Sequence, residues 1–153
     1  MNSPTQLLIF AVGGQRYALD ISQVERVVRM VEITPLSGLP SVVAGVVNIA
    51  GEVIPVISLR RCLVLPERGI ELSDRLIVVN LERRRVALWL DDVLELQNPD
   101  EMQWIPAEEV LSKLVHVEGV LKSEEELVIL QNPEGYLSGQ DHDILDRELP
   151  PAV

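Results

Sequence analysis

Residues Gly45 to Arg60 read GVVNIAGEVIPVISLR, two apolar runs that are hinged at Gly51 and end in Ser-Leu-Arg. Runs rich in β-branched residues favour strands, and a glycine permits backbone conformations that other residues avoid. Pro55 lies inside the second run and has no backbone N–H to donate to a ladder. The pattern therefore predicts two strands, the second of which lies at a sheet edge or carries a bulge.

Other short apolar runs, separated by glycine, proline and polar residues, predict further strands at 7–12, 15–19, 24–31, 76–81, 85–90, 93–96, 115–121 and 127–130. The step Gly13-Gly14 predicts a tight hairpin. Four valines between residues 24 and 31 also fit one face of a helix, but β-branched residues are poor helix formers, so we interpret this segment as a strand. One helical turn is expected at 20–23 and a short helix, capped by Ser58, at 58–63. Without an alternating strand–helix rhythm, the expected fold class is mainly β, as small barrels or a sandwich.

The composition limits the possible functions of the chain. Its 153 residues suffice for one domain or two small subdomains with a common core. The formal net charge of -11 disfavours nucleic-acid binding, because DNA and RNA are polyanions. No apolar run approaches the ~20 residues of a membrane span, so no direct membrane insertion is predicted. The single cysteine, Cys62, fits a reducing cytoplasm, and residues 1–6 do not resemble a signal peptide.

The sequence predicts no catalytic, cofactor or metal site. It contains neither a phosphate-binding loop nor a dinucleotide fingerprint. Asp141-His142-Asp143 is interpreted as a solvated acidic segment rather than a metal site. The run Arg83-Arg84-Arg85 is first a hairpin turn and second a contact for an acidic partner. A small hydrolase or metal-dependent enzyme is kept as an alternative, which a cleft with convergent titratable groups would favour.

The chain resembles the CheW family from about residue 8 to residue 130. The resemblance rests on an ordered set of segments: Tyr17-Ala18-Leu19-Asp20-Ile21, 24–28, 45–60, 76–81, 86–93, Gly119 and 127–130. It implies two small five-stranded SH3-like β-barrels that share an apolar core, in one domain at residues 6–137. The acidic segment 138–153 is expected to be a tail that is a weak helix or disordered.

The resemblance also implies a non-enzymatic cytoplasmic adaptor. CheW-like proteins join the regulatory domain of a CheA-type histidine kinase to the cytoplasmic tip of chemoreceptors. The positions expected to bind these partners are Val24, Arg26, Gly45, Ala50, Val53, Ile54, Val56, Ile57 and Leu96. Ile54 and Val56 alternate with Val53 and Ile57 along a strand, so one pair is expected to face outward and meet the kinase.

Three positions depart from the family pattern. Arg26 and Ala50 stand where the family usually has a glutamate and an arginine that form a pair, and Ser58 replaces an aspartate. Losing both members of a pair avoids leaving one charge unpaired, so the fold should tolerate the change. A matching receptor would then offer an acid near Arg26. The alternative is a diverged regulator that binds only the kinase.

Overall fold

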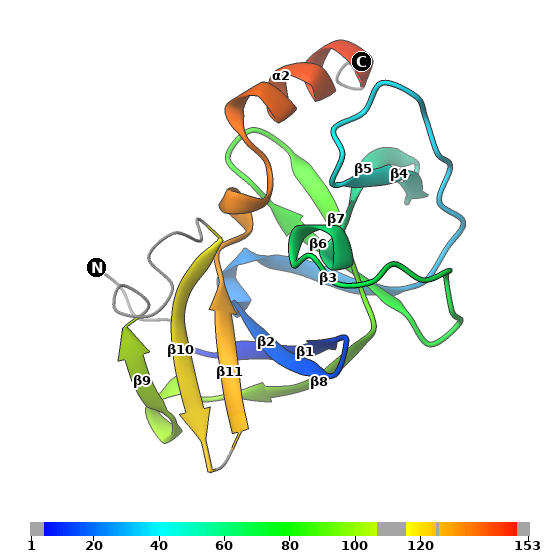
Figure 1. The fold of residues 1–153 in the computed structure, drawn as a ribbon. Helices are drawn as coiled ribbons and strands as arrows, with labels where there is room; N and C mark the ends of the chain where they lie inside the picture. Colours follow the sequence, from blue (N-terminus) through cyan, green and yellow to red (C-terminus); the bar gives the residue numbers. More distant parts are fainter. Residues whose placement is uncertain (1–4, 107–115, 125, 150–153) are drawn as a thin grey trace.

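The computed structural model of the protein describes residues 5–106, 116–124 and 126–149, which form two β-sheets (Figure 1). The first sheet has six strands in the order β8-β1-β2-β11-β10-β9, and the second has five in the order β3-β6-β7-β5-β4. The bounds in the first sheet are β1 Leu7–Val12, β2 Gln15–Asp20, β8 Asp92–Gln97, β9 Gln103–Pro106, β10 Val117–Ser123 and β11 Glu126–Gln131. Those in the second are β3 Val24–Arg29, β4 Val43–Ile49, β5 Glu52–Ser58, β6 Arg75–Asn80 and β7 Arg85–Leu90.

The mainly β fold class is confirmed, and the two sheets come from different parts of the chain. The second sheet is built from one continuous stretch, whereas the first joins β1 and β2 to four strands from the other end of the chain. The first sheet has one strand more than expected, because β9 was not predicted. Its sequence Gln103-Trp104-Ile105-Pro106 is short and ends in proline, so it carries little strand signal. Val115, expected to begin the next strand, lies outside the described residues.

The strand β1 is buried on both of its faces. Leu7 and Ile9 pack with the inner residues of the first sheet, while Leu8 and Phe10 pack into a larger core that lies between the sheets. Successive side chains of a strand point to opposite faces, so a continuous apolar run can serve two cores at once. This explains why β1 has no alternation of apolar and polar residues.

The strand β6 shows the same division in the second sheet. Leu76 and Val78 belong to that sheet's own core, and Ile77 and Val79 belong to the core between the sheets. We call the latter the shared core. Its fully buried members include Phe10, Leu19, Ile57, Leu59, Ile77, Val79, Leu88 and Leu145. The resemblance implied such a shared apolar core, and the structure contains one.

The hairpin predicted at Gly13-Gly14 joins β1 to β2. Both glycines have positive φ, 59° and 83°, which is the conformation that a two-residue turn of this kind requires. The segment with the ambiguous valines forms strand β3, so the choice of strand over helix is confirmed, although the strand ends at Arg29 and does not include Val31. The helical turn near residue 20 is a 3₁₀ turn, Ile21–Gln23, and the turn near residue 60 is the helix α1, Leu59–Cys62, capped by Ser58.

The strand β5 is not at an edge, so that prediction was wrong. It lies between β4 and β7, and the bulge in this hairpin is in β4, between Val43 and Gly45. Pro55 is tolerated because of its place in the ladder. Val46, its partner on β4, exchanges both backbone hydrogen bonds with Thr34, at 2.9 Å each. The backbone nitrogen and C=O of Pro55 therefore point away from β4. Pro55 comes directly before Val56, where the pairing of β5 with β7 begins.

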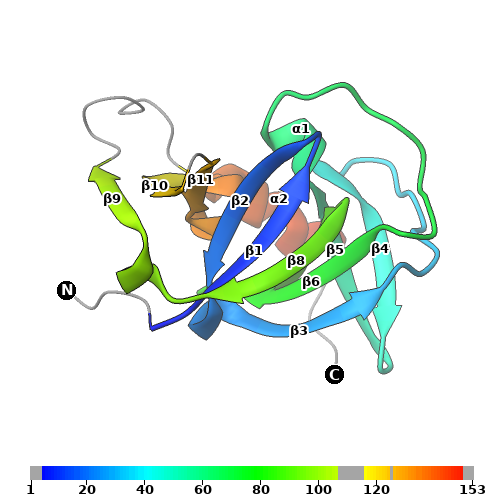
Figure 2. The ribbon, with the colours of Figure 1, turned by 90° about the horizontal axis from the view of Figure 1, so that it is seen from below.

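The segment expected to be an acidic tail begins with a helix that packs against the shared core. The helix α2 spans Gly139–Glu148, and Ser138 and Asp141 form a capping box at its start. Leu145 is fully buried and His142 is nearly so. The helix lies at one end of the molecule, at the top of Figure 1 and behind the sheets in Figure 2. Residues 150–153, also expected to be part of the tail, lie outside the described residues.

Replacing Leu145 with alanine should lower the free energy of unfolding by about 3 kcal/mol, because it leaves a cavity where α2 meets the shared core. Denaturant unfolding of the variant measures this change. Arg147→Ala is the matched control on the same helix, since Arg147 is exposed, and its effect should stay within about 0.5 kcal/mol. Equal stabilities for the two variants would contradict the packing of α2 described above.

Candidate functional site

The surface features of the described residues are exposed aliphatic side chains and a groove lined by charged residues. Among the described residues, no group of three or more His, Cys, Asp and Glu side chains could hold a metal ion. Burial, with a smaller contribution from Asp141, raises the pKa of the Cys62 thiol to about 12, so it is a poor nucleophile at neutral pH. Burial lowers the pKa of His116, which packs against the ring of Tyr136. No helix in the described ranges is long and apolar enough to cross a membrane.

A network of arginines and acids fixes the long loop between α1 and β6. Arg68 donates two hydrogen bonds to Asp74, at 2.7 and 3.0 Å, and one to Asp91 at 2.9 Å. Arg60 donates to the other oxygen of Asp91 at 2.7 Å, and the indole N–H of Trp89 donates to Asp74 at 2.9 Å. Burial alone would raise the pKa of Asp74, but the hydrogen bonds from Arg68, the Glu71 N–H and Trp89 outweigh it and lower that pKa.

Some of the exposed aliphatic side chains lie on β3 and β8. Val27 on β3 and Leu94 and Leu96 on β8 are all exposed, and Leu96 keeps 51% of its surface in contact with solvent. The strands β3 and β8 are edge strands of different sheets. Val24 and Val93, near the start of each, pack against the shared core, and both strands are visible in Figure 2. We call this set, Val24, Val27, Leu94 and Leu96, the junction surface.

Arg26 is exposed on β3, and Ala50 lies in the turn between β4 and β5 with a φ of 52°. The ion pair recorded for Arg26 is with its neighbour Glu25, at 3.9 Å. Other residues form an acid–arginine contact between β3 and β5. Arg85 binds Glu25 at 3.0 Å and also pairs with Glu52, so it links β3 to β5. The sequence did not predict these pairs of Arg85, because the arginine run was interpreted as a turn and as a contact for an acidic partner, not as a link to acids on β3 and β5 of the same chain.

The four residues of β5 expected at the kinase contact are not equivalent. Val53 is 57% exposed, whereas Ile54, Val56 and Ile57 are buried. Ile54 and Val56 pack in the core of the second sheet, and Ile57 packs in the shared core. The expectation that alternate residues face outward fails from Ile54 onward, because β5 is an interior strand with a core on each face. The surface position among the four is therefore Val53.

Gly45 is buried and has a structural role. Its φ is 156°, and a Cβ built on it would lie 2.4 Å from the backbone oxygen of Thr34. Only glycine lets the segment around Thr34 approach β4 this closely. The same segment covers the outer edge of β4 through the two hydrogen bonds between Thr34 and Val46. Gly45 therefore permits the close packing of the Thr34 segment on the hairpin. Because it is buried, it is not exposed to a partner.

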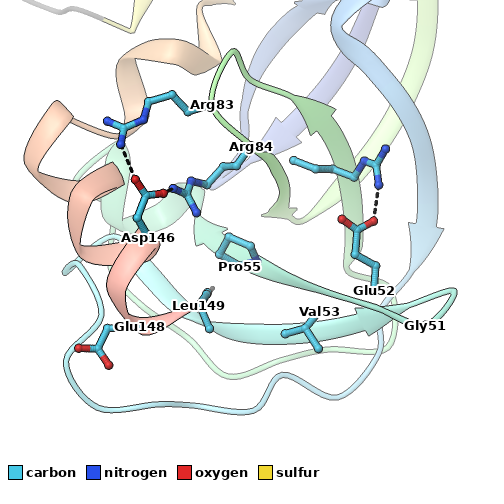
Figure 3. A pocket seen from close by; sticks show the side chains of 10 residues that line it. Gly51, Glu52, Val53, Pro55, Arg83, Arg84, Asp146, Glu148 and Leu149 are labelled. Carbon is cyan, nitrogen blue, oxygen red and sulfur yellow. Dashed lines mark hydrogen bonds and ion pairs between the residues drawn. The ribbon is translucent and has the colours of Figure 1, made fainter. Parts of the chain in front are cut away.

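A groove lies between the start of β5, the turn from β6 to β7, and the last turn of α2 (Figure 3). Its volume is ≈ 710 Å³, and its lining residues are Gly51, Glu52, Val53, Pro55, Arg83, Arg84, Arg85, Asp146, Glu148 and Leu149. We call it the β5–α2 groove. Val53, Pro55 and Leu149 give it an apolar part, and charged side chains surround that part.

Arg83 and Arg84 form ion pairs with acidic residues of α2 in the same chain. Arg83 pairs with Asp143 at 3.1 Å and with Asp146 at 2.6 Å, and Arg84 also pairs with Asp146. The Nε–H of Arg84 donates to Nδ1 of His142 at 3.2 Å. These contacts attach α2 to the turn before β7. Burial, together with the positive charges of Arg84 and Arg83, lowers the pKa of His142.

Known proteins resemble this chain over most of its length. Residues 6–141 match the CheW-like domain. The chemotaxis protein CheW of Bacillus subtilis is 30% identical over 125 residues, which are 80% of each chain. The chemotaxis protein CheW of Klebsiella aerogenes is 27% identical over 145 residues, which cover 92% of this chain and 86% of that one.

A solved structure has the same fold. The crystal structure of the scaffolding protein TtCheW from Thermoanaerobacter tengcongensis matches with a TM-score of 0.79 and 26% sequence identity. The match covers 91% of this chain and 96% of that one.

Replacing Gly45 with alanine should destabilise the protein by about 1–3 kcal/mol, because the new Cβ meets backbone and the φ is unfavourable for a side chain. Gly69→Ala is the control, since a Cβ at Gly69 has nothing within 4 Å. Thermal unfolding of both variants measures the difference. If Gly45→Ala is as stable as the control, Gly45 does not hold the hairpin in the way described.

Stability should fall as the pH is lowered from 7.5 to 5.5, in part because of His142. Its pKa is lowered in the folded protein, so the unfolded chain takes up the proton at a higher pH than the folded protein does. Acidification therefore stabilises the unfolded state relative to the folded state. The loss begins as the pH passes the ordinary histidine value of about 6.5. Thermal midpoints at several pH values should show a smaller fall in His142→Gln than in the wild type. Parallel curves for the two proteins would rule out a contribution from His142.

Proposed function

The chain belongs to the family of CheW-like domains and is a chemotaxis adaptor; from this premise we propose how it does its work. It couples a CheA-type histidine kinase, through the regulatory domain of the kinase, to the cytoplasmic tip of chemoreceptors. It acts in the cytoplasm and catalyses no reaction. The observation that carries the proposal is the presence of exposed apolar side chains at two places, the junction surface and Val53. The described residues contain no group of three or more His, Cys, Asp and Glu side chains that could hold a metal ion.

The junction surface is proposed to bind the receptor. Leu94 and Leu96 project from an edge strand, and Val27 projects from the edge strand of the other sheet. Burial of exposed aliphatic side chains by a partner removes apolar surface from water, which favours association. Arg26 is exposed on the same strand as Val27 and adds a positive charge there, which favours a receptor with an acid at the matching position.

Val53 is proposed to anchor the kinase. It is the exposed member of the four β5 positions, and it lies at the mouth of the β5–α2 groove. The buried Ile54, Val56 and Ile57 would support this contact indirectly, because they hold β5 in place.

A second candidate function is a regulator that binds the kinase alone. The observation that favours it is Arg26, an exposed cation where the family usually has an acid. In that case, receptor tips from the same genome would not bind, whereas the kinase regulatory domain would.

Val53→Asp should weaken kinase binding about thirtyfold, the effect of losing ~2 kcal/mol at an anchor residue, and leave receptor binding unchanged. Leu96→Asp should do the reverse. Binding of the purified protein to the regulatory domain of the kinase and to a receptor-tip fragment from the same genome measures both effects. Leu72→Asp is the control, since Leu72 is 96% exposed on a loop outside both sites. A variant that loses both partners, or neither, would contradict the separation of the two sites.

A further inference from the structure

The strand β3 presents Val27 and Arg29 on the same face. Val28, which lies between them in the chain, packs in the core of the second sheet. Because successive side chains of a strand point to opposite faces, Val27 and Arg29 both point to the other face, the one that borders the shared core. Arg29 is exposed and is the last residue of β3, whose course is visible in Figure 2. Since Val27 belongs to the junction surface, Arg29 continues that surface along the strand.

A second arginine lies directly opposite Arg29. Arg75 is the first residue of β6, and its Cα is the partner of the Arg29 Cα in the antiparallel pairing of β3 with β6. Leu76, the next residue, packs in the core of the second sheet, so Arg75 points to the same face as Arg29. Directly opposed residues in such a pairing have Cα atoms about 4.5–5.5 Å apart, and like charges there are destabilising. The fold therefore brings two positive side chains together at one end of the junction surface.

No carboxylate of the described residues forms an ion pair with either of these arginines. The ion pairs of β3 are those of Glu25 and Arg26. Arg75 donates through Nη1 alone, to the backbone oxygens of residues 72–74, at 2.9 to 3.3 Å. These contacts fix the guanidinium of Arg75 but do not neutralise its charge. A local excess of positive charge thus remains at Arg29 and Arg75, although the formal net charge of the chain is -11.

The chemistry of this pair indicates its ligand. Guanidinium groups bind carboxylates through charge-assisted hydrogen bonds, which are shorter and stronger than those between neutral groups. Val27, two residues before Arg29 on the same face, adds exposed apolar surface beside the two charges. A nucleic acid would be repelled by the acidic remainder of the chain. The ligand that fits is therefore a single carboxylate carried by an otherwise apolar protein segment.

We propose that Arg29 and Arg75 bind the carboxylate of an aspartate or a glutamate at the receptor tip when the tip docks on the junction surface. Arg29 supplies the exposed guanidinium, and Arg75 supplies a second one that the loop carbonyls hold in place. The bound carboxylate neutralises two charges that repel each other in the free protein, so docking relieves this repulsion. This inference rests on the proposed receptor contact at the junction surface and assigns to that contact its electrostatic anchor.

The first test compares stability with binding in the variant Arg29→Glu. This change places opposite charges at the pair with Arg75, so the thermal midpoint should equal or exceed that of the wild type. The affinity for a receptor-tip fragment from the same genome should nevertheless fall more than about tenfold, because a carboxylate then meets a carboxylate. Binding to the regulatory domain of the kinase should not change. If Arg29 had only a structural role, stability and receptor binding would fall together.

The second test identifies the acid. Arg29→Gln should weaken receptor binding up to about fivefold, the effect expected for one exposed ion pair, and should reduce its dependence on salt. Arg147→Gln is the matched control, since Arg147 is an exposed arginine on α2, and it should bind as the wild type does. Replacing each acid of the receptor fragment by its amide in turn should reveal one whose effect is not additive with that of Arg29→Gln.

Three results would overturn the inference: unchanged receptor affinity in both Arg29 variants, additive effects for every acid of the fragment, or an Arg29→Glu protein that is less stable than the wild type. If Leu96→Asp loses the receptor while the Arg29 variants bind normally, the proposed function stands and the carboxylate site is wrong. A wild-type protein that does not bind the receptor fragment would contradict the proposed receptor contact itself, and this inference with it.

Discussion

Burial of single strands on both faces is the constraint on which the rest of this structure depends. The strands β1 and β6 each send alternate side chains into the core of their own sheet and into the shared core. Each sheet needs the other to bury the second face of these strands, because without it the side chains of the shared core would be exposed to water. The two sheets therefore form a single unit, although one is built from a continuous segment and the other from both ends of the chain.

The same constraint decides where a partner can bind. With the interior strands largely buried, exposed aliphatic side chains remain on edge strands, at strand ends and in loops, as for Leu96 on the edge strand β8 and Val53 near the start of β5. Val53 and Leu96 lie on strands whose backbone is already ordered, so a partner that buries them does not have to order the chain first. Such an arrangement suits a scaffold, which must hold other proteins in a fixed geometry.

Charged side chains attach the peripheral elements to this unit. Arg68 and Asp74 hold the loop before β6, Arg85 links β3 to β5, and Arg83 and Arg84 hold α2. Most of these pairs are partly exposed, so each contributes little to stability. Asp74 is the exception, because its carboxylate is completely buried and its oxygens are satisfied by Arg68, Trp89 and a backbone N–H. The pairs of Arg83 and Arg84 with Asp146 place α2 beside the turn between β6 and β7, and both elements line the β5–α2 groove.

The sequence by itself determined the mainly β class, most of the strands, the hairpin at Gly13-Gly14 and the membership of the CheW family, because these depend on local patterns and on ordered motifs. It could not determine which face of β5 is exposed. A β-branched run looks the same in an edge strand and in an interior strand, and only the neighbours β4 and β7 decide between them. Nor could it show that Arg83 and Arg84 pair with α2, some 60 residues away. Burial and ion pairing between distant segments are properties of the folded chain. Only the tertiary structure could therefore show that Gly45 is buried and that Val53 is exposed.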